Sequence, residues 1–385
     1  MRVLFIISDL GFHGAQKQVV EMSRELARGG HEVTIYTLND DAPRAKELEG
    51  TGVRVVTDQK KVKLDPAVLG RLNKLIRTWK ADIVHGFLYD GDIYARIAAI
   101  GTDAAVLNSE RSDNYTISRT QYLAHWLTKG LVDGVIANSR SGSAFAQKLY
   151  GYDPDHMHVV WNGMRIEDFE RKAVSDRDYR TEFFGPGEHK IACMIGHIKP
   201  AKDYPLALDT AATLVQLAPE WRVLFLGDQL STPGQYQAGR DSDTSDYKRM
   251  VMEQYEALGI ADKVVFAGAR SDAPAILAQC DVQLMTSCRE GFPNVVLEGM
   301  VLGVPVVSTD YSDIRHILPR KEQVVASRSP MELARAIIAV SEDRDAVVAE
   351  QKHWVRTHAS IEKVTQELQS VYRRYIRTPE RALAA

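Results

Sequence analysis

Strand-like and helix-like segments alternate along this chain, and this alternation restricts its fold more than any other feature. RVLFIIS (residues 2–8) is a short apolar run rich in β-branched residues, typical of a buried parallel strand. The helix-patterned QVVEMSRELARGG (18–30) follows it and ends in a Gly-Gly stop. HEVTIYT, VRVV, DIVHGF, AAVLNS and DGVIANS continue the alternation. Strands that alternate with helices form parallel βαβ units, so the pattern predicts a doubly wound α/β sheet.

The alternation is interrupted once and then starts again. Residues 161–190 are polar and charge-dense and carry a Gly-Pro-Gly sequence near their end, as an interdomain connection does. Strand signals return in KIACMIG, WRVLFLGD, KVVFAG, DVQLMTS and VPVVSTD. The chain has 385 residues, which is more than one hydrophobic core usually serves. We therefore predict two Rossmann-like parallel-sheet domains that face a central cleft.

The changes of pattern also give the expected domain boundaries. They are an N-terminal domain over residues 1–165, a linker over 166–188 and a C-terminal domain over 189–355. A helical segment over 356–385 completes the chain and is a candidate to pack back on the N-terminal domain.

Composition excludes several classes of protein. The formal net charge of −3 gives no reason to expect a nucleic-acid partner. The three cysteines are scattered, without the spacing of a disulfide framework or a metal site, which fits a reducing compartment. No apolar run reaches the length of about 18 residues that a membrane span needs, and the apolar start is too short for a signal peptide. These features predict a cytoplasmic protein.

Two segments stand apart from the alternation. Residues 58–80 hold seven basic and two acidic residues, with leucines at helical spacing. Such a helix could lie on an anionic membrane surface, or it could pack its apolar face on the sheet. The second segment is the polar loop 228–247, which contains the D-x-D sequence of residues 241–243. In some other proteins a D-x-D sequence holds a divalent metal ion on a diphosphate ligand, but we do not predict a metal site here.

Two carboxylates stand close together in SCREGFPNVVLEGM (287–300), with seven residues between Glu290 and Glu298. A predicted strand precedes them, and ligands of a doubly wound sheet bind beyond the carboxyl ends of its strands. Pro293 suits a first helical turn, so residues 294–303 are predicted to be a helix. The N–H groups at the start of that helix favour an anion such as phosphate, and Gly291 lets the backbone come close to a ligand.

The expected positions of the two carboxylates suggest a ligand. Glu290 lies in the loop that enters the predicted cleft, where it can accept hydrogen bonds from hydroxyls. Glu298 follows Asn294 by four residues on the same helix face and can hold a vicinal diol such as a ribose. A nucleotide sugar carries both phosphate and hydroxyls and suits this arrangement. In the alternative interpretation, Glu290 is an acid at a helix N-terminus and Glu298 pairs with a neighbouring base.

The same stretch carries a family resemblance. S-x-x-E-G-F-P-N-V-V-L-E-G-M-V-L-G-V-P-V-V resembles the E-x7-E signature of the retaining glycosyltransferases of family 4, which have the GT-B fold. GFHGAQKQVVEMSRELARGGHEVTIYT is similar to the family's glycine loop, helix and strand, and DIVH, VIANS, VVWNGM, FLGD, KVVFAG and LAQCDV follow in the family's order. The resemblance covers most of the chain and implies a hexosyltransferase type of enzyme.

The resemblance also assigns donor-binding residues. Glu290 corresponds to the carboxylate that contacts the donor sugar, and Glu298 to the one that contacts the ribose. Lys202 corresponds to a lysine on the donor diphosphate, but the accompanying arginine is replaced by His197, which is only partly charged at neutral pH. The other donor-binding residues that we expect are Gly14, Arg270, Gly291, Phe292, Pro293, Asn294 and Val295. Lys199 or Arg270 could supply the missing charge.

Catalytic roles are expected for Glu290, Lys202 and His85. Many members of the family have a histidine near the anomeric carbon, after a strand equivalent to AAVLNS, where this chain has no histidine. His85 ends another strand of the same predicted sheet and is the alternative, although an isolated histidine is also common in packing. Arg111 and Arg119 are expected to contact the acceptor.

The implied reaction moves a sugar from a UDP- or GDP-sugar to a hydroxyl of a glycan or lipid-linked acceptor, with retention. We expect no cofactor and no metal, and a role in bacterial polysaccharide or cell-surface glycan synthesis. The protein would then be cytoplasmic and a candidate for peripheral binding at the inner face of the cell membrane. An epimerase or phosphorylase of the same fold is the alternative, and a non-catalytic two-lobed binding protein is a further one.

Overall fold

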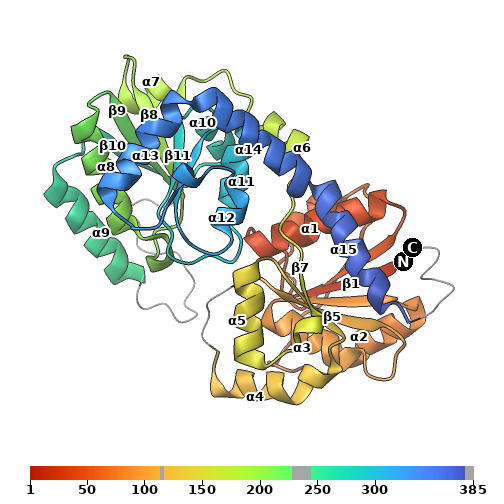
Figure 1. The fold of residues 1–385 in the computed structure, drawn as a ribbon. Coiled ribbons are helices and arrows are strands. Elements are labelled where there is room, and N and C mark those ends of the chain that lie inside the picture. The colour runs from red at the N-terminus through yellow and green to blue at the C-terminus, as the bar shows by residue number, and fades with distance from the viewer. Residues whose placement is uncertain (113–116, 228–243, 378–385) are drawn as a thin grey trace. The chain divides into compact units, whose positions relative to one another are not determined.

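The computed structural model describes residues 1–112, 117–227 and 244–377. The chain divides into two compact units. Unit 1 comprises residues 1–165 together with 359–385, and unit 2 comprises residues 166–358. Each unit is built on one parallel sheet flanked by helices (Figure 1). This is the doubly wound α/β architecture that the alternating pattern predicts.

Unit 1 contains a seven-stranded sheet in the order β3-β2-β1-β4-β5-β6-β7. Its strands are β1 (Arg2–Ile7), β2 (Glu32–Thr37), β3 (Arg54–Thr57), β4 (Ile83–Phe87), β5 (Ala105–Glu110), β6 (Gly134–Ala137) and β7 (Met157–Val159). Its helices are α1 (Gly14–Arg28), α2 (Pro66–Trp79), α3 (Leu88–Ala98), α4 (Arg119–Thr128), α5 (Arg140–Tyr150) and α15 (Ile361–Tyr375), with 3-10 turns η1 (Pro43–Leu48), η2 (Lys129–Leu131) and η3 (Pro154–His156). The central strands are buried on both faces, which explains their continuous apolar runs.

Unit 2 contains a six-stranded sheet in the order β10-β9-β8-β11-β12-β13. Its strands are β8 (Lys190–Gly196), β9 (Trp221–Gly227), β10 (Val264–Gly268), β11 (Val282–Met285), β12 (Val306–Thr309) and β13 (Val324–Val325). Its helices are α6 (Ile166–Lys172), α7 (Tyr179–Phe184), α8 (Tyr204–Leu217), α9 (Thr244–Leu258), α10 (Ala273–Ala278), α11 (Asn294–Leu302), α12 (Ile314–Ile317), α13 (Pro330–Glu342) and α14 (Arg344–His358), with 3-10 turns η4 (Pro200–Lys202) and η5 (Lys321–Gln323).

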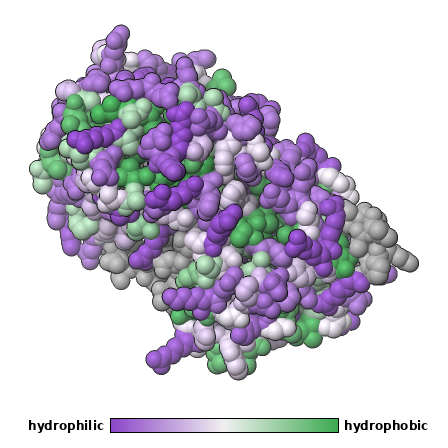
Figure 2. Space-filling view, viewed as in Figure 1, coloured by the Kyte–Doolittle hydropathy of each residue, from purple (hydrophilic) through white to green (hydrophobic). Residues whose placement is uncertain are grey.

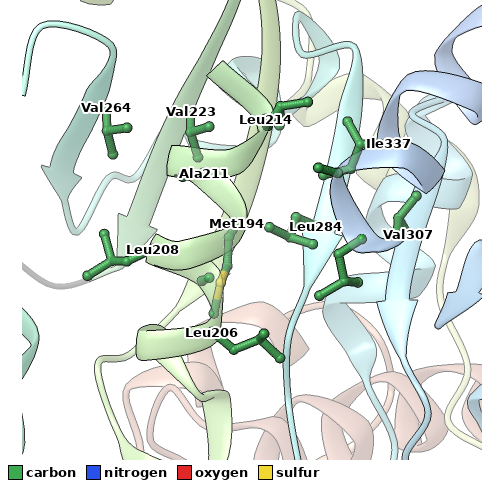
Figure 3. Packing of buried hydrophobic residues seen from close by; sticks show 14 of the residues in the cluster. Met194, Leu206, Leu208, Ala211, Leu214, Val223, Val264, Leu284, Val307 and Ile337 are labelled. Carbon is green, nitrogen blue, oxygen red and sulfur yellow. The ribbon is translucent and has the colours of Figure 1, made fainter. Parts of the chain in front are cut away.

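The core of unit 2 forms where α8 and α13 cover one face of the sheet. Met194, Val223 and Leu284 point from neighbouring strands toward Leu214 of α8 and Ile337 of α13 (Figure 3). All five side chains are fully or almost fully buried. This packing fixes the strand ends, and therefore the loops that follow them.

The stretch 166–188, expected to be an interdomain linker, is instead part of unit 2. It carries α6 and α7, and Tyr179, Phe183 and Phe184 of α7 pack against a buried cluster of that unit. The high charge of this stretch made it look like a connection. Aromatic residues at its end supply the contacts that attach it.

The last helix, α15, belongs to unit 1, although the whole of unit 2 precedes it in the chain. Its residues Ile361, Val364 and Leu368 are fully buried in the core cluster that also contains Val19 and Leu26 of α1. In Figure 1 α15 lies beside α1. The close approach requires Gly163, where a Cβ atom would lie 2.9 Å from the side chain of Ile361.

Candidate functional site

The sheet of unit 2 has a topological switch point between β8 and β11. From β8 the chain adds β9 and β10 on one side and then crosses to β11 on the other. Neighbouring crossover connections leave a crevice beyond the carboxyl ends of such a strand pair, which is where ligands of doubly wound sheets bind. Lys202 lies in the loop after β8, and Glu290 lies in the loop after β11.

The structure brings these two residues together. Lys202 Nζ lies 2.6 Å from Glu290 Oε1, and the two side chains are only 11% and 18% exposed. The Ser287 hydroxyl donates a longer hydrogen bond of 3.4 Å to the same carboxylate oxygen. The pKa of the neighbouring Tyr311 phenol is raised, chiefly by burial and also by the charge of Glu290. A cation and an anion are thus held in contact at the switch point, 88 residues apart in the chain.

The loops around this pair are fixed in an unusual backbone conformation. Three of the five described non-glycine residues with positive φ lie here: Asp203 (φ 48°), Ser312 (φ 46°) and Arg328 (φ 54°). Arg328 forms an ion pair with Asp203, and the Ser312 hydroxyl donates a 2.6 Å hydrogen bond to the Gly291 carbonyl. Left-handed backbone at non-glycine residues costs about 1–3 kcal/mol each and tends to cluster at functional sites.

The helix α11 begins directly after the Glu290 loop. Its N-cap is Pro293, which gives no side-chain hydrogen bond to the helix start. Phe292 and Pro293 are buried, whereas Gly291, Asn294, Val295 and Glu298 are partly exposed. Glu298 lies one turn into α11, four residues after Asn294. The region therefore combines a helix N-terminus, a lysine and two carboxylates.

The end of β8 is crowded by the backbone of β9. A Cβ atom on Gly227, whose φ is 139°, would lie 2.2 Å from the carbonyl oxygen of Gly196. Only glycine fits at this approach. The next residue after Gly196, His197, is exposed to solvent, as is Lys199.

Arg270 does not supply free positive charge in this structure. Its guanidinium forms a bidentate pair with Asp272, with both N–O distances 2.7 Å, and lies 3.2 Å from a carboxylate oxygen of Glu182. Its ring contacts are with Tyr179 and Phe183 of α7. The expectation that Arg270 compensates for His197 is therefore corrected, because two carboxylates already balance its charge.

His85 is a core residue, which corrects the expectation that it acts on the substrate. It is fully buried in β4, with Nδ1 2.7 Å from the Tyr372 hydroxyl and Nε2 2.8 Å from the Ser109 hydroxyl. Burial lowers the pKa of the imidazole well below its ordinary value. A neutral ring with both nitrogens engaged inside unit 1 cannot touch a ligand in this conformation.

The other expected residues of unit 1 lie at its strand and helix ends. Gly14 is exposed at the start of α1, after an N-cap residue that gives no side-chain hydrogen bond. Arg119 is exposed at the start of α4. Arg111 follows β5 and lies over the ring of Phe87, where its guanidinium donates hydrogen bonds of 3.1 Å to Asn162 and 3.2 Å to Ser109. Burial lowers the pKa of Arg111 to about 10.

Arg111 also lines a pocket of about 340 Å³ within unit 1. The pocket lies beyond the carboxyl ends of β4 and β5, between α3, α4 and the end of α5. Sequence reasoning did not find it, because its lining comes from positions spread over more than sixty residues and carries no spacing signal.

Family models describe most of the chain. A model described as "Glycosyltransferase Family 4" matches residues 12–168, and one described as "Glycosyl transferases group 1" matches residues 176–357. The first match lies almost wholly in unit 1 and the second in unit 2. The chain carries both domains of a GT-B glycosyltransferase.

Individual relatives are distant. The chain is 24% identical to D-inositol 3-phosphate glycosyltransferase of Thermobispora bispora, over 94% of this chain and 91% of that protein. It is 28% identical to mannosylfructose-phosphate synthase of Agrobacterium fabrum over 42% of this chain, which spans only 34% of the relative. Among solved structures, Anabaena HepE in complex with UDP is similar with a TM-score of 0.78 and 18% identity, covering 96% of this chain and 99% of that one. These likenesses support the GT-B fold of the chain.

Asp203, Ser312 and Arg328 are site residues that sequence reasoning missed. Asp203 had a local signal, because an acid before Tyr-Pro is a typical helix N-cap, and its side chain accepts a hydrogen bond from the Leu206 N–H. Arg328 and Ser312 had none, because their partners are distant in sequence. The D-x-D of residues 241–243 lies outside the described residues.

Proposed function

We propose that the protein transfers a sugar, with retention, from a nucleoside-diphosphate sugar to a hydroxyl of a glycan or lipid-linked acceptor. The observation that carries this proposal is the Lys202–Glu290 ion pair at the switch point of unit 2, beside the N-terminus of α11. A diphosphate suits the lysine and the helix N-terminus, and a carboxylate suits sugar hydroxyls. The names of the relatives support the same reaction class.

In this proposal each group has a defined role. Lys202 and the first N–H groups of α11 stabilise the negative charge that the diphosphate gains as its bond to the anomeric carbon breaks. Glu290 accepts hydrogen bonds from the sugar, and Glu298 accepts them from the ribose. The acceptor oxygen forms its new bond on the same face of the sugar, and its proton passes to the released diphosphate. No enzymic nucleophile and no metal ion take part.

His197 and Gly14 complete the proposed donor contacts. His197, exposed directly after β8, donates a ring hydrogen bond to a diphosphate oxygen in this proposal. Gly14 stays a predicted donor contact, and the exposed N-terminus of α1 has the backbone groups that a helix start offers to an anion.

A further part of the proposal is peripheral binding to an anionic membrane, and α4 suits this better than residues 58–80. The apolar face of α2 is occupied, because Val68, Leu72 and Ile76 are buried against the sheet of unit 1. None of the helices in residues 1–112, 117–227 and 244–377 is long and apolar enough to cross a membrane. The packing interpretation of the basic segment therefore agrees with the structure.

In α4 the apolar side chains are exposed instead. Tyr122, Leu123, Trp126 and Leu127 are each 45–65% exposed, and Leu131 of the following turn is 40% exposed. Hydrophobic surface is visible at the edge where α4 lies (Figure 2). Residues 117–132 contain Arg119 and Lys129 and no acidic residue, so the segment complements anionic lipid headgroups.

Vesicle binding tests this part. We expect the protein to co-sediment with phosphatidylglycerol vesicles and to lose binding in a Trp126→Gln, Leu127→Gln variant. The matched control is Arg71→Gln, Arg77→Gln on α2, which should bind as the wild type does. Loss in the control variant alone would return the assignment to residues 58–80.

The donor site is tested by calorimetric titration with UDP, GDP and ADP. One nucleotide should bind, and Glu298→Ala should weaken it, because the ribose loses its carboxylate partner. With the donor then known, the anomeric configuration of the glycoside product gives the stereochemistry, and inversion would refute retention. Turnover with water or phosphate as the only co-substrate would favour the alternative, an epimerase or phosphorylase. Absence of nucleotide binding in the folded protein would refute the proposal.

A further inference from the structure

Three strand-end loops of unit 2 hold a non-glycine residue in left-handed backbone. Asp203 follows β8, Ser312 follows β12 and Arg328 follows β13, with φ values of 48°, 46° and 54°. Glycine adopts this backbone readily, whereas an L-residue there costs free energy that the surrounding structure must offset. A side chain at such a position is therefore expected to make contacts that glycine could not make. All three side chains bond to a neighbouring loop.

The Arg328 guanidinium connects the loops after β8, β11 and β13. It forms an ion pair with the Asp203 carboxylate. It also donates hydrogen bonds of 3.3 Å to the Thr286 carbonyl and 3.4 Å to the Ser287 carbonyl. A guanidinium carries five N–H donors in a fixed planar fork, so one side chain can bond to several acceptors. Glycine at this position would leave the three loops without this link.

The same contacts adjoin the Lys202–Glu290 ion pair. Lys202 directly precedes Asp203, and Glu290 follows Ser287 by three residues. Arg328 therefore holds the residue next to the lysine and, at the same time, the start of the loop that carries the carboxylate. Because Lys202 and Glu290 are 88 residues apart in the chain, their 2.6 Å contact depends on links between the loops.

Two further hydrogen bonds join the lysine loop to the carboxylate loop. The hydroxyl of Thr286, a fully buried residue, donates a 2.8 Å hydrogen bond to the Lys202 carbonyl. The Cys288 N–H donates a 2.9 Å hydrogen bond to the Ala201 carbonyl. These bonds fix the main chains of the two loops against each other, and Arg328 extends the network to the loop after β13.

Ser312 holds the carboxylate loop from its other side. The Ser312 hydroxyl donates a 2.6 Å hydrogen bond to the carbonyl of Gly291, the residue after Glu290. Arg328 bonds to the carbonyl of Ser287, before Glu290. The loop is thus held on both sides of Glu290 by side chains whose own backbone is left-handed.

We infer that Arg328 is a positioning residue, which keeps the Lys202 amine and the Glu290 carboxylate in contact by bonding to the loops that carry them. Its own charge is balanced by Asp203, so it acts through these loops rather than on a ligand. Its effect on nucleotide binding rests on the function proposed above. The positioning itself does not, because it depends only on contacts within unit 2.

Lysine labelling tests the inference with the full chain. The amines are trace-labelled with acetic anhydride, and mass spectrometry measures the labelling rate of each lysine. Arg328→Gly removes the guanidinium and accepts the left-handed backbone. In this variant Lys202 should label about fivefold faster than in the wild type, the effect of releasing a partly solvated ion pair. Arg328→Lys keeps a charge for Asp203 and should give an intermediate rate.

Two controls separate positioning from a general loosening of unit 2. Lys248 of α9 is as buried as Lys202, each residue being 8% exposed, and it should keep its wild-type rate in Arg328→Gly. Arg320→Gly removes another arginine of the same unit, one that pairs with two carboxylates. This variant should leave the labelling rate of Lys202 unchanged.

Each other outcome overturns the inference. An unchanged rate at Lys202 in folded Arg328→Gly would refute it, as would an equal rise at Lys248 or an equal rise at Lys202 in Arg320→Gly. If Arg328→Gly does not fold, Arg328→Lys serves instead, and a wild-type rate at Lys202 would then refute the inference.

UDP titration of the same samples separates the two proposals. UDP binding should weaken about fivefold in Arg328→Gly, because the lysine is no longer held in place for the diphosphate. If the wild type binds no nucleotide while the labelling rates differ as expected, the proposed function fails and the positioning holds. Nucleotide binding by the wild type with unchanged labelling in the variants would refute the positioning alone.

Discussion

The Lys202–Glu290 ion pair predicts that neutralising its two members changes nucleotide affinity in opposite directions. In the ligand-free protein the carboxylate occupies the lysine at 2.6 Å. A diphosphate must therefore compete with Glu290 for Lys202. Lys202→Met removes the cation that binds the diphosphate, whereas Glu290→Gln removes the competitor and leaves the cation free.

The magnitudes follow from the geometry. A hydrogen bond to a charged group contributes about 1.5–3 kcal/mol, so Lys202→Met should weaken UDP binding by about tenfold to about a hundredfold. The ion pair is partly solvated, with side chains 11% and 18% exposed. Breaking it therefore costs diphosphate binding about 1 kcal/mol. Glu290→Gln should therefore bind UDP about fivefold more tightly. Sugar transfer should fall in both variants, because Glu290 is also the proposed partner of the donor sugar.

Calorimetric titration with UDP at constant ionic strength measures both effects. Lys321→Met, at an exposed lysine in the 3-10 turn η5 of the same unit, is the matched control and should change affinity little. If Glu290→Gln weakened UDP binding as much as Lys202→Met does, the carboxylate would be part of the nucleotide site rather than a competitor for its cation. That result would refute the reasoning.

Three further predictions concern the stability of unit 1 and the chemistry of unit 2. Burial, with Arg96 and Lys129 nearby, lowers the pKa of His125 to about 2, so the folded protein keeps it neutral while the unfolded chain takes up a proton below about pH 6.5. Stability should fall as the pH drops from 6.5, by about 2 kcal/mol at pH 5, and His125→Gln should show less of this loss in urea unfolding at the two pH values. Tyr372→Phe leaves His85 Nδ1 without its 2.7 Å partner and should cost about 1–3 kcal/mol of unfolding free energy without changing UDP affinity, since both residues lie in unit 1. EDTA should leave UDP affinity and sugar transfer unchanged, and a loss restored by Mg²⁺ would contradict the metal-free reaction.

The sequence was sufficient for the fold because the signals were local and repeated. The short apolar runs of central strands such as β1 and β8 are largely buried, and such runs can be recognised without tertiary information. The loop that carries Glu290 and the helix that carries Glu298 were also predictable, since Pro293 and the strand before it define both. The family resemblance added the order of the motifs.

The sequence was insufficient where long-range packing decides. Nothing around Arg270 indicates that Glu182, 88 positions earlier, lies within ion-pair distance of it. His85 lies near the end of a predicted strand, which suggested an accessible edge of the sheet, yet the hydroxyl of Tyr372 from α15 contacts its Nδ1 inside the core. Sequence reasoning also could not show that the amide of Asn108, near the end of β5, has no hydrogen-bond partner within the described residues, because four other elements line the pocket around it.

The position of α15 has a consequence for synthesis of the protein. The sheet of unit 1 is complete once β7 has been made, but the surface that Ile361, Val364 and Leu368 cover stays bare until just over two hundred further residues have been added. During that interval the nascent chain exposes an apolar surface of unit 1 that is prone to aggregation. Unit 2 can already fold in the same interval. A premature stop codon at the start of α15 should therefore destabilise unit 1, which is translated first, and leave the stability of unit 2 unchanged.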